Sequence, residues 1–198
     1  MSSALLVIDF QNDFCPGGAL PVADADSLPP LLNRLIREFR QVFFSQDWHP
    51  RGHVSFASSH PGRHPFDSIL LPEGRQTLWP DHCIEGTAGA AFHPALEVPA
   101  DAVIIHKGTD ARRDTYSAFG GHDRSTALAL DVLLRRASVG ELVLCGVATD
   151  FCVLHTALDG RALGYEVTVV ESACRGIDTE GSLAAAWSRM TAAGVRRE

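Results

Sequence analysis

Lysine is almost absent from this sequence. Among 198 residues there are sixteen arginines and a single lysine, Lys107. Arginine keeps its proton and cannot act as a compact point charge, so this one ammonium group is chemically distinct from the other cations. Basic residues are also outnumbered, 17 against 24 acidic ones, which gives a net charge of -7. Such a chain lacks the clustered cations that bind phosphates, and we expect no nucleic-acid partner.

Long apolar runs are missing as well. No stretch approaches the roughly 20 apolar residues of a membrane-spanning helix, and we expect no membrane partner. The first ten residues, MSSALLVIDF, place no basic residue before their short apolar run. They predict a first strand and not a secretory signal, with a cytoplasmic location. A hydrophobic content of 45% with 21% charged residues excludes disordered and collagen-like chains.

The cysteines form no CxxC pair, and their number is odd. They are Cys15, Cys83, Cys145, Cys152 and Cys174. A disulfide framework is therefore not expected, and at least one thiol must be free. Each cysteine is either a small buried hydrophobe or a reactive group.

Short apolar runs alternate with helical patterns along the chain. The runs are Ala4 to Ile8, Val42 to Ser45, Ala102 to His106, Leu142 to Val147 and Glu166 to Val170. The helical patterns cover Leu28 to Phe39, Ser125 to Ala137, Phe151 to Leu163 and Thr179 to Ala193. This alternation predicts an α/β fold, a three-layer αβα sandwich with a five- or six-stranded parallel sheet. Val195 could begin the sixth strand.

One segment breaks the alternation, and we expect a single domain over residues 1–198 with an insertion at about 48–100. The insertion holds six of the nine histidines and seven of the eleven prolines, and lacks a long amphipathic helix. A long irregular segment inside a compact domain is usually functional or disordered. Its Trp, Phe and His content argues against disorder.

Chemically active residues follow four of the predicted strands. The first strand ends in Asp9, the second in Asp47-Trp48-His49, the third in Lys107, and the fourth runs through Gly146-Val147-Ala148-Thr149-Asp150 to Cys152. In an open parallel sheet, ligands bind beyond the carboxyl ends of the strands. An acid, a pair of metal-ligand types, the only lysine and a cysteine are therefore expected at one edge.

Cys152 lies near the start of a predicted helix, with Thr149 or Asp150 as the N-cap. A helix N-terminus and a nearby ammonium both favour a thiolate, which is the nucleophilic form. The alternative is a packed core cysteine. Asp9 could exchange a proton with the thiol or could simply cap the following turn. Lys107 could hold Asp9 ionised or could be a solvated surface residue.

Asp47 and His49 lie on the same side of an extended segment because side chains alternate along it. With His82 they provide three ligands and leave positions open for water or substrate, as catalytic metal sites do. We expect one divalent metal ion, Zn²⁺ before Fe²⁺ or Mn²⁺. His53 is a further candidate ligand. The alternative is a set of hydrogen-bonding loop histidines.

Several blocks of the sequence resemble the nicotinamidases of the isochorismatase-like cysteine hydrolase superfamily. The blocks are Asp9-Phe10-Gln11-Asn12-Asp13-Phe14-Cys15-Pro16-Gly17-Gly18, Asp47-Trp48-His49-Pro50, Leu78-Trp79-Pro80-Asp81-His82-Cys83, Lys107-Gly108-Thr109-Asp110 with Tyr116-Ser117-Ala118-Phe119, and Gly146-Val147-Ala148-Thr149-Asp150 with Cys152. They follow the family order from near residue 5 to about 180. Any one block is weakly specific, and together they are highly specific.

The resemblance implies a three-layer αβα fold and assigns roles to individual residues. It implies a catalytic triad of Asp9, Lys107 and Cys152, and a metal held by Asp47, His49 and His82. It further implies a cis peptide bond between Val147 and Ala148, with the N–H groups of Ala148 and Cys152 facing the substrate oxygen. Phe14 and Trp79 match the residues that sandwich a pyridine ring, and Tyr116 matches another pocket position.

The activity implied by the resemblance is hydrolysis of nicotinamide to nicotinate and ammonia, in NAD salvage, with pyrazinamide as a second substrate. The resemblance is also compatible with a homo-oligomer. One alternative is another amidohydrolase of the superfamily that acts on a carbamoyl or ureido substrate, although those relatives generally lack the metal. Isochorismatase activity is disfavoured because that branch does not use the thiol. A binding protein without catalysis and a structural zinc protein are the alternatives from other classes.

Overall fold

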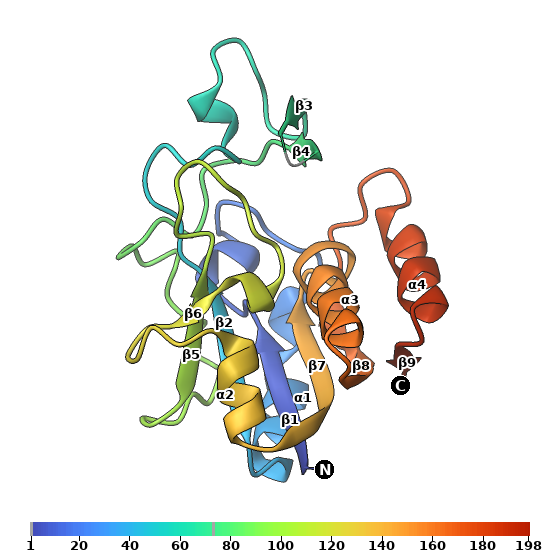
Figure 1. The fold of residues 1–198 in the computed structure, drawn as a ribbon. Helices are drawn as coiled ribbons and strands as arrows, with labels where there is room; N and C mark the ends of the chain where they lie inside the picture. The colour runs from blue at the N-terminus through green and yellow to red at the C-terminus, as the bar shows by residue number, and fades with distance from the viewer. Residues whose placement is uncertain (1, 73) are drawn as a thin grey trace.

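The computed structural model describes residues 2–72 and 74–198, which form a seven-stranded sheet in the order β6-β5-β2-β1-β7-β8-β9 (Figure 1). The strands are β1 (Ser2–Ile8), β2 (Val42–Asp47), β5 (Val103–Lys107), β6 (His122–Asp123), β7 (Val139–Val147), β8 (Glu166–Arg175) and β9 (Arg196–Arg197). Neighbours pair in parallel, except that β6 is antiparallel to β5.

Strand β1 lies at the centre of the sheet and is covered on both faces. Residues Ala4 to Ile8 are fully buried, which explains why this strand is a continuous apolar run and does not alternate. Helix α1 (Pro29–Glu38) covers one face, and α2 (Leu130–Arg136) and α3 (Leu154–Ala162) cover the other (Figure 1). Helix α4 (Ser182–Ala192) packs beside α3 and β9. The predicted three-layer α/β fold is confirmed.

The sheet differs from the prediction at both of its edges, and β7 and β8 are longer than the predicted runs Leu142 to Val147 and Glu166 to Val170. The sixth parallel strand is Arg196–Arg197, one residue later than expected, and β6 adds a seventh, antiparallel strand. Two-residue strands carry no apolar pattern that could predict them. Helix α2 begins at Leu130 because the segment before it is a turn. There the Asp123 carboxylate accepts bonds from the N–H and the hydroxyl of Thr126, at 2.8 and 2.6 Å.

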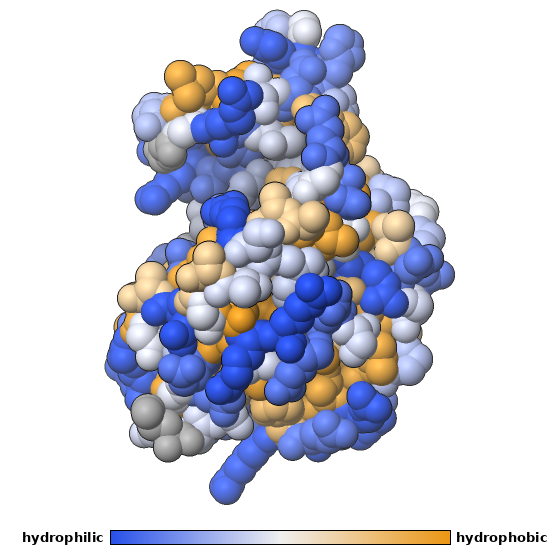
Figure 2. Space-filling model, turned by 90° about the vertical axis from the view of Figure 1, so that its right-hand side faces the viewer, coloured by the Kyte–Doolittle hydropathy of each residue, from blue (hydrophilic) through white to orange (hydrophobic). Residues whose placement is uncertain are grey.

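The segment between β2 and β5 leaves the sheet, and the hairpin that it contains lies at the top of Figure 1. Within its described residues it contains a 3-10 turn, Ala57–Ser59, and a hairpin of β3 (Ser68–Leu71) and β4 (Gly74–Thr77), but no α-helix. In the space-filling view the hairpin lies in the upper lobe, which has hydrophobic patches among hydrophilic surface (Figure 2). The side chains of Phe66 and Leu70 are exposed there. No helix in the described ranges is long and apolar enough to cross a bilayer.

Four adjacent strands deliver the candidate site residues to one edge of the sheet. In the order β5-β2-β1-β7, the strands end at or just before Lys107, Asp47, Asp9 and the turn that carries Cys152. The order of these strands in space is not their order in the chain. Residues from the beginning and the last quarter of the sequence therefore become neighbours.

Gly146 allows β1 and β7 to approach closely next to this edge. Its φ of 114° lies in the left-handed region, and it pairs in register with Ile8. A Cβ at this position would lie 2.1 Å from the backbone oxygen of Ile8. Because both atoms belong to paired strands, neither can move away without disrupting the sheet. Gly164, just after α3, has a similar φ of 89°, but no other atom of the described part of the chain lies within 4 Å of an added Cβ.

We predict that Gly146→Ala lowers the free energy of unfolding by about 2–5 kcal/mol, from backbone strain and steric overlap together. Gly164→Ala should lower the free energy of unfolding by only about 1–2 kcal/mol, because it adds the strain of a left-handed backbone conformation without a steric overlap. Urea denaturation of both variants gives the comparison. Equal losses in the two proteins would contradict the steric argument.

Candidate active site

Lys107 is the centre of a buried charge cluster at the carboxyl ends of the strands. Its side chain is 1% exposed, although lysine is rarely buried without partners. The ammonium nitrogen lies 2.9 Å from Asp9 Oδ2, 2.5 Å from Asp47 Oδ1 and 3.4 Å from Cys152 Sγ. A solvated surface position for this lysine is thereby excluded.

The two carboxylates in the cluster have opposite pKa shifts. Burial raises the pKa of Asp9 to about 6, and Lys107 only partly opposes this effect. For Asp47 burial acts in the same direction, but Lys107 and His49 outweigh it and hold its pKa well below the usual range. The same carboxylates hold the pKa of Lys107 well above its usual value, against the effect of burial. Asp9 is therefore the group that can gain and lose a proton near neutrality.

Local structure fixes the Asp9 carboxylate in place. Asp9 follows β1 with a φ of 46°, a left-handed conformation that is uncommon for a residue other than glycine. Its N–H donates to the Ser45 carbonyl at 3.2 Å, and its Oδ1 accepts from the Ser45 hydroxyl at 2.7 Å. These contacts leave Oδ2 directed at Lys107. The turn-capping alternative for this carboxylate does not fit these contacts.

Cys152 lies on a π-helical turn, Thr149–Val153, that leads into α3. The residue at the N-cap of this turn is Ala148, so the expected capping by Thr149 or Asp150 is wrong. Cys152 Sγ and carboxylate oxygens of Asp9 and Asp47 lie within 4.8 Å of one another. Burial raises the pKa of the thiol well above its usual range, and Lys107 opposes this only in part. The resting thiolate expected from the sequence is therefore not favoured, and the thiol needs a base.

The backbone before Cys152 presents an amide group to the same space. The peptide bond between Val147 and Ala148 is cis. Within residues 2–72 and 74–198, the Ala148 N–H donates to no other residue. Ala148 also lines the pocket that contains Cys152. Its N–H is thus available to an oxygen of a bound molecule.

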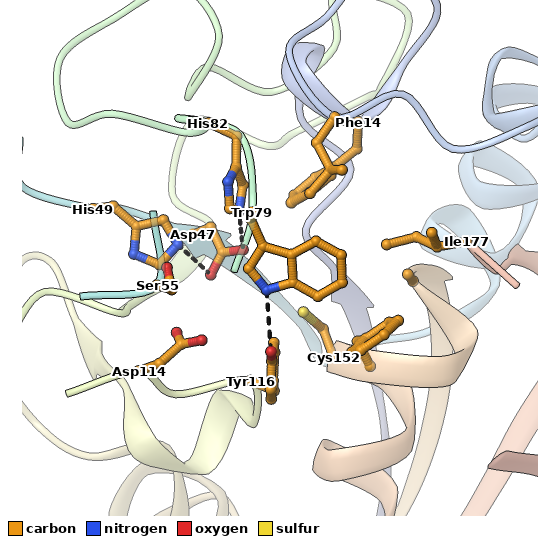
Figure 3. Close-up of a pocket in the computed structure, with 13 residues that line it drawn as sticks. Phe14, Asp47, His49, Ser55, Trp79, His82, Asp114, Tyr116, Cys152 and Ile177 are labelled. Carbon is orange, nitrogen blue, oxygen red and sulfur yellow. Dashed lines mark hydrogen bonds and ion pairs between the residues drawn. The ribbon is translucent and has the colours of Figure 1, made fainter. Parts of the chain in front are cut away.

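Asp47, His49 and His82 form a cluster that suits a divalent metal ion. Their ligand atoms lie within 4.8 Å of one another, and all three side chains are buried. Nδ1 of His49 is 3.0 Å from the Gly108 carbonyl, and Nδ1 of His82 is 2.8 Å from the Pro80 carbonyl. Such bonds place a proton on Nδ1 and leave Nε2 as the nitrogen of each ring that faces Asp47 and that would bind a metal (Figure 3). Burial and His49 lower the pKa of His82 to about 4, which favours the neutral ligand form.

His53 lies beside this cluster and has partners of its own. Its ring centre is 4.3 Å from that of His49. Nδ1 is 2.8 Å from the Ser55 hydroxyl, and Nε2 is 3.2 Å from the Arg113 carbonyl. His49, His53 and Asp114 form a second group whose ligand atoms lie within 4.8 Å. Both nitrogens of His53 are thus occupied, and the ring supports His49 from the side.

Cys152 and the three metal-ligand candidates line one pocket with aromatic walls, and Asp9 and Lys107 lie behind that lining (Figure 3). Phe14, Trp79 and Tyr116 all line it, as expected from the sequence. Trp79 Nε1 donates to the Tyr116 hydroxyl at 3.1 Å, which fixes the two rings relative to each other. The pocket also contains residues to which the sequence assigned no role: Leu20, Ser55, Asp114, Phe151 and Ile177. Of these, Ser55 and Phe151 lie in or next to the sequence blocks of His49 and Cys152 and could have been found from those positions.

Comparison with known proteins identifies the family. The family model described as the isochorismatase domain matches residues 3–196. This chain belongs to the isochorismatase family. It is 47% identical over 194 residues to the nicotinamidase of Acinetobacter baylyi, covering 98% of this chain and 91% of the relative.

Solved structures of this family superimpose closely on the chain. A nicotinamidase and pyrazinamidase of Acinetobacter baumanii has a TM-score of 0.94 at 49% identity, with 99% of this chain and 95% of the other covered. A pyrazinamidase of Pyrococcus horikoshii, solved in complex with zinc, has a TM-score of 0.83 at 35% identity, with 100% and 99% covered. The metal-binding relative agrees with the donor set found here, which supports a divalent metal.

We predict that His82→Ala weakens Zn²⁺ binding at least about 100-fold, because it removes one of the three ligands expected for the metal. His53→Ala should weaken it at most about tenfold, since both ring nitrogens of His53 have protein partners. His122→Ala, at an exposed position on β6, is the matched control. Competition titrations against a zinc-binding dye measure all three. Equal losses in His53→Ala and His82→Ala would place His53 among the ligands.

Proposed function

We infer that this chain is an amidohydrolase that converts nicotinamide to nicotinate and ammonia. The observation that carries this is the buried ammonium of Lys107 within reach of both Asp9 and the Cys152 thiol. The Cys152 thiol lines an aromatic pocket that suits a planar ring. The relatives named above are nicotinamidases and pyrazinamidases. The nicotinate formed is a precursor for pyridine nucleotide synthesis.

The first step is attack of the Cys152 sulfur on the carboxamide carbon. The buried thiol is neutral at rest, so Asp9 accepts its proton as the carbon–sulfur bond forms. Lys107 remains charged and stabilises the negative charge that moves from Asp9 to the sulfur and on to the substrate. The N–H groups of Ala148 and Cys152 would bind the oxygen of the tetrahedral intermediate.

The second step releases ammonia and then the acid. Asp9 returns its proton to the amine as the carbon–nitrogen bond breaks, which leaves a thioester on Cys152. Asp9 then takes a proton from water, and the hydroxide attacks the thioester carbon. The thiolate leaves and is protonated again. One amide and one water thus give one carboxylate and one ammonium ion.

Zn²⁺ is the ion we propose for Asp47, His49 and His82, because two imidazoles and a carboxylate are common zinc ligands. When bound, the metal supplies an electrophilic centre that can hold the ring nitrogen directly or through water. Phe14 and Trp79 would stack on the two ring faces, while Tyr116 holds Trp79 in place. Pyrazinamide has the same ring size and the same carboxamide, so it should be cleaved as well.

A carbamoyl or ureido amide is the alternative substrate. It uses the same thiol, acid and lysine, but it gives no role to the three buried ligands at one end of the pocket. It also leaves the aromatic walls without a ring to contact. Nicotinamide accounts for both features, and we prefer it for that reason.

We predict that Cys152→Ala abolishes ammonia release from nicotinamide, at least about 10⁴-fold, because the nucleophile is lost. The variant should keep its fold, since Ala fits a buried position. Purified protein, the variant and a chelated sample are compared in an ammonia assay. Full turnover by Cys152→Ala would refute the mechanism. Inactive native protein with bound metal would refute nicotinamide as the substrate.

We also predict that kcat/KM falls as the pH decreases through about 6, with a slope of one. The reaction needs ionised Asp9 as the base, and this carboxyl is protonated below its raised pKa of about 6. At higher pH the rate should stay level, because the pKa values of Cys152 and Lys107 are raised well above their usual ranges. Metal content is measured at each pH, which distinguishes protonation of Asp9 from loss of the metal. A midpoint near 3.8 would contradict the assignment.

A further inference from the structure

Asp150 has a buried carboxylate that the mechanism above does not use. It is 4% exposed, and its three hydrogen-bond donors all come from a distant part of the chain. Oδ1 accepts from the Ile177 N–H at 3.0 Å, and Oδ2 accepts from the Asp178 N–H at 2.8 Å and from the Ser182 hydroxyl at 2.5 Å. Among the described residues no cation pairs with it. Its charge is balanced by N–H groups and by the start of α4.

These bonds connect two walls of the catalytic pocket. Asp150 belongs to the π-helical turn that carries Phe151 and Cys152, which both line the pocket. Ile177, held by Oδ1, lines the same pocket from the loop after β8 (Figure 3). The Asp150 side chain itself is not part of that lining. It therefore acts on the pocket only through the segments it joins.

Gly176 allows the loop after β8 to pack closely against the Asp150 carboxylate. A Cβ at Gly176 would lie 3.1 Å from Asp150 Oδ1 and 2.8 Å from a methyl of Leu183. Glycine at this position leaves room for the carboxylate between the loop and α4. The close approach shows that loop, carboxylate and helix pack as one unit.

We propose that Asp150 is a positioning residue, which fixes the turn bearing Cys152 against the loop bearing Ile177 and so sets the line of attack of the sulfur. The proposal rests on the proposed amide hydrolysis. Attack requires the sulfur and the carbon to be aligned at close range, and a misplacement of about 1 Å can cost about 100-fold in rate. The bonds of Asp150 are a direct link between the nucleophile turn and the loop that carries Ile177.

Asp150→Asn is the decisive variant, because it keeps the shape but turns one acceptor into an NH₂ group that faces N–H or O–H donors. Nicotinamide turnover should fall in kcat by about 10- to 100-fold, with a change in KM of less than about threefold. Ser182→Ala removes one donor and keeps both backbone bonds, so its kcat should fall by less than about fivefold. Asp178→Asn is the matched control, an exposed acid on the same loop whose carboxylate, among the described residues, accepts only from the Leu183 N–H.

Alkylation by iodoacetamide, mapped by mass spectrometry, separates positioning from general loss of structure. All five cysteines are buried and free, so Cys145 in β7 is an internal reference. Asp150→Asn should raise the alkylation rate of Cys152 at least about fivefold and leave that of Cys145 unchanged. Equal increases at both sites, or a kcat within twofold of the native value, would overturn the proposal. Native protein without ammonia release would refute the proposed function instead, and the alkylation ratio would still test Asp150.

Discussion

One buried ammonium group faces two carboxylates and a thiol, and the chemistry of the site follows from this imbalance. Burial raises the pKa of both carboxyl groups; Lys107 opposes this only in part at Asp9, whose pKa rises to about 6, whereas Lys107 and His49 together hold the pKa of Asp47 well below its usual range. Asp47 stays ionised and suited to a metal, whereas Asp9 can carry a proton. Arginine could not replace Lys107, because its planar guanidinium does not fit between three close partners and is not a point charge. The only lysine of the chain is thus located where no other cation suffices.

Much of the fold was predictable from the sequence because strands buried on both faces leave continuous apolar runs. Residues Ala4 to Ile8 and Leu142 to Val147 are two examples, and both runs lie within strands at the sheet centre. The two-residue strands β6 and β9 and the hairpin of β3 and β4 leave no such signal. Helix α2 was predicted too long, because a turn held by the Asp123 side chain looks helical in its apolar spacing. The order of strands in space also depends on contacts between distant residues.

Site residues at strand ends were predictable for a related reason. The rule that ligands bind at the carboxyl edge directs attention to Asp9, Asp47, Lys107 and Cys152, and the structure brings all four together. The protonation state of the thiol was not predictable, because it depends on burial and on neighbouring charges. Ile177 and Asp114 were missed because they lie on loops without a motif. The distant partners of Asp150 were equally invisible in a sequence read one segment at a time.

The non-sequential strand order also affects how this protein acquires its activity. The site is complete only when β5, β2, β1 and β7 have all paired in register, and these strands come from the beginning, middle and last third of the chain. Pairings between distant segments form slowly because the intervening chain must first be closed into loops. Local helices can form earlier, on a much shorter timescale. Substrate turnover therefore reports that folding is complete. A fragment of the chain that contains only the Cys152 thiol lacks Asp9, Asp47 and Lys107.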